Sequence, residues 1–259
     1  TYTFVPSEPG TVATCDLMQL PLNGTTWTSV QTAKPCPSTW AVTLPAVDGD
    51  YTTRVTLTDA AGNTSAYGES PTYSLDLTGP NAPAFTAAPS GTDNIPAVSW
   101  SWTYEPLSTG VCTLAHGGST VATVTCDTGT FNTSLGAGDG PYTLTVRLTD
   151  QYGNVGGTTT SVVYTLDLTP PGAPVVSGPS TTSNVTTADY AIVGSVEPGA
   201  TSECRLERDG AVVSDWASCV LPLTRSLSGD GSYVLKVRLT DQYGNLGPAG
   251  ASPAYLLDT

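Results

Sequence analysis

The chain has few basic residues, and this shortage argues against one large class of partners. It contains 8 Lys and Arg against 22 Asp and Glu, which gives a formal net charge of −14. Without a cluster of basic side chains it cannot neutralise a phosphate backbone, so we expect no nucleic-acid partner. The acidic residues are spread thinly along the chain. This spread favours a role in solubility, with divalent cation binding as the specific alternative.

Histidine and the common catalytic motifs are also scarce. His116 is the only histidine, and it begins a His-Gly-Gly stretch that predicts a turn. A zinc set or a Ser-His-Asp triad would depend on this residue alone. The sequence also lacks G-x-S-x-G, G-x-x-x-x-G-K-[ST] and H-E-x-x-H. We therefore assign no catalytic residue and interpret the protein as non-enzymatic.

Long apolar runs and helix signals are missing too. No run of 18 apolar residues occurs, so no membrane span is expected. Thr, Ser, Gly and Val dominate, and prolines interrupt the chain at short intervals, as in all-β proteins. The sequence contains no signal peptide, which favours a mature or excised piece of a longer protein.

What the chain does contain is one stretch that occurs three times. The sequence D-G-x-Y-x-L-x-V-R-L-T-D-Q-Y-G-N surrounds Tyr142 and recurs with small changes around Tyr51 and Tyr233, and the tyrosines are 91 residues apart. A gap-free repeat of this length is the size of one small β-sandwich domain. We therefore expect three modules, over residues 1–79, 80–170 and 171–259. The linkers at 77–83 and 168–174 are short and rich in proline, so they should be semi-rigid.

Each copy alternates apolar and polar residues with the period of a strand. Tyr142, Leu144, Val146 and Leu148 lie on one face and threonines on the other, which predicts a half-buried strand. The D-Q-Y-G-N segment predicts a turn, and a second alternating run follows it. Each module should thus end in a hairpin, at 142–149 and 162–168 in module two. In module three the same reasoning predicts seven strands, at 173–177, 190–196, 204–208, 211–213, 221–227, 233–240 and 254–257.

Six cysteines fall two to a module, and no C-x-x-C pair is present. One disulfide inside each module is the simplest interpretation, although six cysteines allow 15 pairings and six buried free thiols are the alternative. Repetition at equivalent positions selects Cys15–Cys36, Cys112–Cys126 and Cys204–Cys219. Such bridges would place the protein outside the cytoplasm.

Taken together, three motifs resemble a known family. E-P-G-A-T-x-E-C-x-L, the D-G-x-Y segment and Y-x-L-D-x-T-P-P-x-A-P are similar to the bacterial immunoglobulin-like repeats of large secreted and surface-anchored proteins. The resemblance covers all 259 residues, with Thr-Gly-Pro for Thr-Pro-Pro in the first linker. It implies three seven-stranded Greek-key β-sandwiches in a rod, with each repeated tyrosine as a tyrosine corner. Such repeats form the stalks of adhesins and surface fibres, and some bind calcium between domains.

Module one differs at its start. Thr1 to Val5 matches a second strand, because Glu8-Pro9-Gly10 corresponds to Glu197-Pro198-Gly199. Its first strand is therefore missing. Either the chain is cut from a longer array of the same repeat, which we favour, or a neighbouring chain supplies the strand by β-augmentation.

A calcium site is predicted at each joint between modules. In an immunoglobulin-like sandwich the last strand leads into the linker, so its acidic residue should face the loops at the near end of the next module. Carboxylate and amide oxygens are the ligands that calcium takes. The predicted sets are Asp76, Glu105, Asp150 and Asn154 at the first joint, and Asp167, Glu197, Asp241 and Asn245 at the second. The alternative is that the Asp and Asn residues only shape their turns and the glutamate caps a loop.

Three functions are compatible with these features. The near-identity of the later half of each module favours a structural spacer, a stalk or fibre segment, because selection for length repeats a unit while recognition diversifies its loops. The second is an adhesin module that binds a glycan or a host protein, and the third is a filament subunit that assembles by strand addition.

The tryptophans do not align between modules, which favours core packing over sugar-stacking platforms: Trp27, Trp40, Trp100, Trp102 and Trp216.

Overall fold

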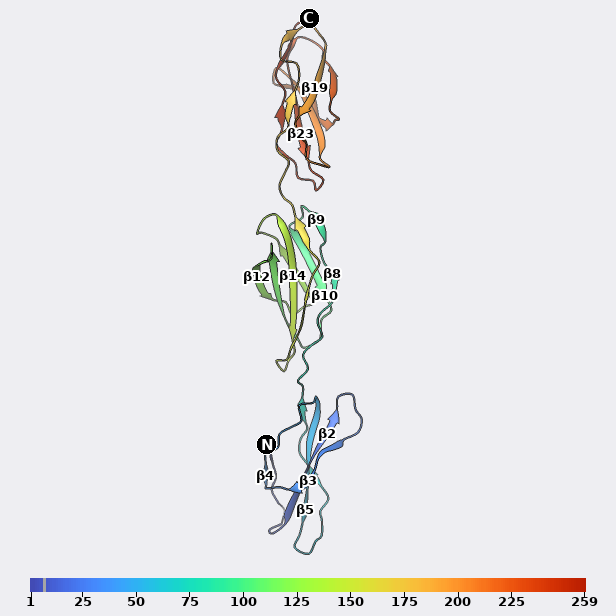
Figure 1. Cartoon of the computed structure of the whole chain (residues 1–259), viewed down its shortest axis with the longest axis vertical. Helices are drawn as coiled ribbons and strands as arrows, with labels where there is room; N and C mark the ends of the chain where they lie inside the picture. The colour runs from blue at the N-terminus through green and yellow to red at the C-terminus, as the bar shows by residue number, and fades with distance from the viewer. Residues whose placement is uncertain (7) are drawn as a thin grey trace.

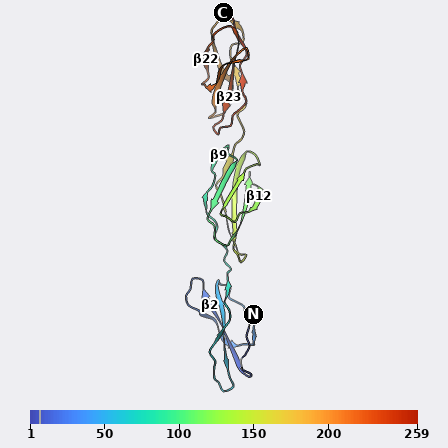
Figure 2. The same cartoon turned by 180° about the vertical axis from the view of Figure 1, so that it is seen from behind.

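The computed structural model describes residues 1–6 and 8–259. Figure 1 shows three β-modules arranged in a line as an extended rod, with the C-terminus at the far tip of module three, and the view from behind in Figure 2 agrees. No helix occurs among the described residues. The predicted all-β fold of tandem sandwiches is confirmed.

Module two is a sandwich of two sheets. Its strands are β8 (Phe85–Ala87), β9 (Gly91–Asp93), β10 (Ala97–Trp102), β11 (Thr109–His116), β12 (Ser119–Thr125), β13 (Thr130–Ser134), β14 (Gly140–Thr149), β15 (Val155–Thr160) and β16 (Tyr164–Leu166). One sheet has the order β13-β10-β8. The other has the order β12-β11-β14-β16-β9, and β15 pairs with β14 beside it.

Module three repeats this arrangement. Its strands are β17 (Val175–Ser177), β18 (Thr182–Ser183), β19 (Thr187–Val193), β20 (Thr201–Arg208), β21 (Ala211–Ser218), β22 (Leu223–Ser226), β23 (Gly231–Thr240), β24 (Gly250–Ala251) and β25 (Tyr255–Leu257). Its sheets have the orders β17-β19-β22 and β18-β25-β23-β20-β21, with β24 on β23. Asp209 and Gly210 both have positive φ, as the predicted tight hairpin between β20 and β21 requires.

The prediction of seven strands and a simple final hairpin was wrong in detail, because the first and last strands are each broken in two. Pro89 and Pro179 lie where the first strand leaves one sheet for the other, and a proline cannot donate to a ladder. The last strand breaks at Ser161, whose buried hydroxyl accepts a hydrogen bond from the Leu144 backbone N–H at 3.0 Å. The chain therefore pairs with β14 first as β15 and again as β16.

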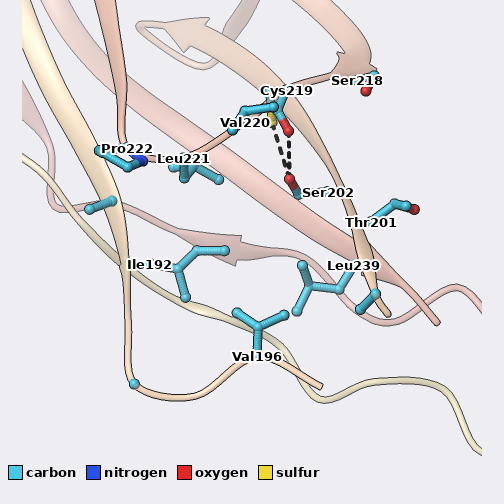
Figure 3. Close-up of a pocket in the computed structure, with 13 residues that line it drawn as sticks. Ile192, Val196, Thr201, Ser202, Ser218, Cys219, Val220, Leu221, Pro222 and Leu239 are labelled. Carbon is cyan, nitrogen blue, oxygen red and sulfur yellow. Dashed lines mark hydrogen bonds between the residues drawn. The ribbon is translucent and has the colours of Figure 1, made fainter. Parts of the chain in front are cut away.

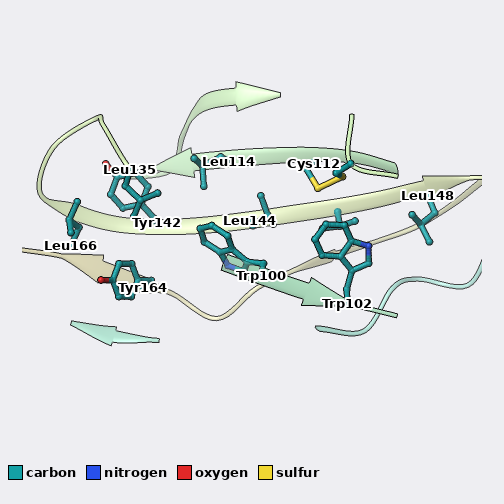
Figure 4. Close-up of a cluster of buried hydrophobic side chains, with 12 residues drawn as sticks. Trp100, Trp102, Cys112, Leu114, Leu135, Tyr142, Leu144, Leu148, Tyr164 and Leu166 are labelled. Carbon is teal, nitrogen blue, oxygen red and sulfur yellow. A yellow bond between two sulfur atoms is a disulfide. The ribbon is translucent and has the colours of Figure 1, made fainter. Parts of the chain in front are cut away.

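The alternating residues of β14 form the core of module two. Tyr142, Leu144 and Val146 are fully buried, and Trp100 and Trp102 lie against them, as Figure 4 shows. Core packing of these two tryptophans is thus confirmed. The Tyr142 hydroxyl donates to the Gly138 carbonyl oxygen at 2.8 Å, and Tyr51 and Tyr233 make the equivalent bond four residues back, so the predicted tyrosine corners are present.

The predicted disulfides are all present. Cys15–Cys36, Cys112–Cys126 and Cys204–Cys219 join Cα atoms 5.8, 5.9 and 5.8 Å apart, and the described chain contains no free cysteine. Each closes a loop of 14 to 21 residues. In the chain-entropy view a bridge of this size contributes about 3 kcal/mol to the stability of its module.

Module one has the smallest second sheet. Its strands are β1 (Tyr2–Thr3), β2 (Val12–Pro21), β3 (Thr28–Pro35), β4 (Thr39–Trp40), β5 (Gly49–Thr58), β6 (Gly68–Glu69) and β7 (Tyr73–Leu75). Among the described residues of module one, only β1 and β4 form the second sheet, so the predicted strand over 1–5 is short. In the described chain β7 pairs only with β5, whereas its counterpart β16 also pairs with β9. Tyr73 is accordingly 54% exposed, against 3% for Tyr164.

Candidate functional site at the interdomain joints

The Asp–Asn turn, residues 150–154 in module two and 241–245 in module three, lies where the preceding linker arrives. Asp150 shapes the turn, because one of its carboxylate oxygens accepts hydrogen bonds from the backbone N–H groups of Tyr152 and Asn154, both at 2.8 Å. The Asn154 side chain donates to the other oxygen at 2.8 Å. Asp241 is held in the same way by Tyr243 and Asn245.

The asparagine of this turn also reaches the preceding module. Asn154 Nδ2 donates to the Asp76 carbonyl oxygen at 3.0 Å, and Asn245 Nδ2 donates to the Asp167 carbonyl oxygen at 2.9 Å. At the second joint, Asn94 Nδ2 of module two also lies 3.3 Å from Asn245 Oδ1. Each joint thus has an amide bridge between modules, made by the side chain that shapes the turn.

The hydrogen bonds of the turn favour the ionised aspartate. Burial by itself raises the pKa of Asp150, but the bonds from Asn154, Tyr152 and Gly153 outweigh it and lower the pKa below its usual value. The same balance lowers the pKa of Asp241, which is 5% exposed. Both turns therefore carry a negative charge at neutral pH.

A second contact holds the linker at the end of the module that it leaves. Asp139 accepts a hydrogen bond from the Leu168 backbone N–H at 2.8 Å and another from the Thr169 hydroxyl. Asp48 does the same for Leu77 and Thr78. We call this contact the carboxylate clamp. The sequence prediction missed it, although its signal is there: the Asp-Gly before each repeated tyrosine keeps the 91-residue interval.

Glycines let each linker lie directly on the segment that follows the Asp–Asn turn. Any Cβ at Gly156 would clash with the carbonyl oxygen of Pro80, and any Cβ at Gly247 would clash with that of Pro171. These two glycines are 91 residues apart, as are the two prolines. The linker is therefore fixed at three places: the clamp, the glycine contact and the amide bridge.

The residues predicted to bind calcium are brought together only in part. Asp76 meets Asn154 through its backbone carbonyl, while its carboxylate accepts from the Thr78 N–H at 3.1 Å. Glu105 lines a hollow of about 470 Å³ that also contains Asp76 and Tyr152.

The second joint has the same arrangement of the predicted ligands. Asp167 accepts from the Thr169 N–H at 3.1 Å, and Glu197 lines a hollow of about 190 Å³ beside the linker. The described residues contain no group of three or more His, Cys, Asp or Glu side chains arranged to hold a metal. As they stand, the turn carboxylates face N–H donors, and calcium binding stays a prediction.

Comparisons with known proteins concern the fold and the family. Residues 19–72 match the family model described as bacterial Ig-like domain. No curated protein matches the chain. The described residues include no helix long and apolar enough to cross a membrane.

Two solved structures illustrate the structural likenesses. The FN1–FN3 domains of chicken CNTN1 cover 98% of this chain and 91% of their own at 12% identity and a TM-score of 0.38. The fibronectin(III)-like modules of Clostridium thermocellum CbhA cover 68% of this chain and 94% of their own at 15% identity and a TM-score of 0.32. Because both scores lie below 0.5, the fold assignment rests on the strand pairing described above. Module one carries the matched segment, and modules two and three repeat part of its sequence at an interval of 91 residues, so the three modules are similar to bacterial immunoglobulin-like domains.

Proposed function

We propose that the chain is a non-enzymatic spacer, a stiff stalk or fibre segment of an extracellular bacterial surface or adhesin protein. The observation that carries the proposal is that both joints are built alike. Each has a carboxylate clamp, a glycine contact and an amide bridge at positions 91 residues apart. A flexible tether would need none of these contacts.

Two further features support this role. Three intramodule disulfides suit an oxidising compartment, in which a small module gains stability that its modest core cannot supply alone. The formal charge of −14 disfavours collapse of one module onto another. Further copies of the repeat in a longer parent chain would extend the same rod.

The test removes the amide bridges without removing the modules. In the double variant N154A/N245A, spin labels on modules one and three should report a broader distance distribution, and small-angle scattering should report a smaller radius of gyration. N63A is the matched control, because Asn63 makes the same side-chain bond to Asp59 at 2.8 Å but is exposed at the far end of module one.

The outcome decides between a stiff rod and a loose chain. If N63A and the double variant change the distances equally, the bridges do not set the stiffness of the rod. If the unmodified protein already bends as freely as a flexible tether, the spacer proposal is wrong.

A further inference from the structure

Modules two and three differ in the side chains that pack at one end of the core. Trp102 of β10 lies opposite Phe85 of β8, and Ile192 of β19 lies opposite Val176 of β17. Phe85 and Val176 are 91 residues apart, so Trp102 and Ile192 occupy equivalent places in the two sandwiches. Module three therefore has smaller side chains on both strands where module two has two aromatic rings.

In module two the indole ring of Trp102 fills this part of the core. Trp102 is 4% exposed, packs edge-on against Phe85 with ring centroids 6.2 Å apart, and lies beside the disulfide of Cys112 and between the two sheets (Figure 4). Leu148 closes the end of this layer.

In module three the same region is a cavity of about 510 Å³. Ile192, Val196 and Leu239 face a common space below the segment from Cys219 to Pro222, as Figure 3 shows. Leu239 is the counterpart of Leu148, being 91 residues further along the chain. The Ser202 hydroxyl is occupied by a hydrogen bond to the Cys219 carbonyl oxygen at 2.6 Å.

The residues that line the cavity indicate which chemical class of ligand it could bind. Among the described residues, no charged side chain lines the cavity, and its wall combines aliphatic side chains with the hydroxyl residues Thr201, Ser202 and Ser218. Its volume is in the range of small-molecule sites, and it lies between two packed sheets, which makes it a slot for a flat group. We propose that module three binds a small, uncharged, flat aromatic molecule in this slot, in the place that an indole ring takes in module two. This site would add ligand binding to the spacer role and does not depend on it.

The sequence offers a direct probe of this site. The chain has only two isoleucines, Ile192 in the cavity wall and Ile95 in module two, 52% exposed. In protein labelled at the isoleucine δ1-methyl groups, titration with indole should shift the Ile192 signal saturably and leave the Ile95 signal in place. Equal shifts of both signals, or no shift of Ile192 up to millimolar indole, would overturn the proposal.

A substitution that fills the cavity provides a second test. I192W should place an indole in the slot from within, raise the melting temperature of module three and abolish indole binding in equilibrium dialysis. V213W is the matched control, because Val213 is 52% exposed on β21 and does not line the cavity; this variant should bind as the unmodified protein does. Undiminished binding by I192W would show that indole binds elsewhere and would contradict the assignment.

Discussion

The side-chain amide of Asn154 crosses a module boundary to donate a hydrogen bond to the Asp76 carbonyl oxygen, 3.0 Å away. The same amide group ties the turn together through Asp150, so the local shape of one module and its attachment to the next depend on one side chain. Because Asn245 and Asp167 repeat the bond, the direction of the rod is set by hydrogen bonds that each repeat encodes.

Acid should loosen the joints through Asp150 and Asp241. Their pKa values lie below normal in the folded protein, so the unfolded chain takes up protons first as the pH falls. The stability that the ionised Asp150 and Asp241 give to the folded protein should be fully present above the ordinary pKa of about 3.8. It should be lost as the pH falls through their lowered pKa values in the folded protein. The variant D150N/D241N should be less stable at neutral pH but should lose less of its melting temperature between pH 5 and pH 2. An unchanged acid dependence would contradict the assignment.

Replacing Leu107 by glycine should stabilise module two. Leu107 has a φ of 64° and is 71% exposed, and its counterparts after the Glu-Pro pair are Gly10 and Gly199, with φ of 81° and 80°. A side chain in this left-handed conformation is strained, and L107G should raise the free energy of unfolding by about 1 kcal/mol. Denaturant titration measures the change. G199L is the reciprocal variant and should lower the stability of module three; a loss in both variants would show that the strain is absent.

Alkaline pH should destabilise module three through Tyr190. Its hydroxyl is buried and has no hydrogen-bond partner among the described residues. Burial first, then the neighbouring Tyr255 and Tyr233, raise its pKa to about 12. Above pH 10 the unfolded chain loses this proton while the folded protein keeps it, so stability should fall by about 1.4 kcal/mol per pH unit up to about pH 12.

The variant Y190F isolates this effect. It removes an unsatisfied hydroxyl, so it should be at least as stable as the unmodified protein at pH 7 and should lose less stability between pH 10 and pH 12. A strongly destabilised Y190F at pH 7 would mean that the hydroxyl has a partner that holds it.

Calcium at the joints remains to be tested by titration. Binding would require the carboxylates of Asp76, Glu105 and Asp150 to turn toward one ion, which would offset their mutual repulsion and lock the first joint. Calcium should then release or absorb heat in calorimetry, and a chelator should reduce the radius of gyration while each module stays folded. If millimolar calcium produces no heat and chelator changes neither shape nor melting temperature, hydrogen bonds and proline hold the joints.

The repeat made much of the fold predictable. The alternation around Tyr142 located β14 and the core, and the equivalent cysteine positions selected the disulfides. The break at Ser161 could not be predicted, because a threonine-rich run continues the strand pattern across it. What breaks the run is a tertiary hydrogen bond to Leu144.

The sequence predicted which residues meet at the joints, but it did not predict which of their atoms form the contact. Sandwich topology predicted that Asp76 faces Asn154, and the contact found there is a hydrogen bond from the Asn154 side chain to the Asp76 carbonyl oxygen. Sequence could not show that the aspartate contributes its backbone carbonyl or that the asparagine presents N–H, because an amide offers either face at the same position. The cavity of module three also escaped notice, since Ile192 is as good a core residue in sequence as Trp102.

The parallel pairing of β9 with β16 governs how a module responds to tension. These segments come from the first and the last part of the module's chain, and Gly91, Thr92 and Asp93 lie alongside Tyr164, Thr165 and Leu166. A pull on the two ends slides the segments along each other, so the hydrogen bonds between them carry the load simultaneously instead of opening one by one. The pairing of β18 with β25 gives module three the same geometry. In a stalk under flow, each of these modules would therefore resist stretching in shear, its strongest direction.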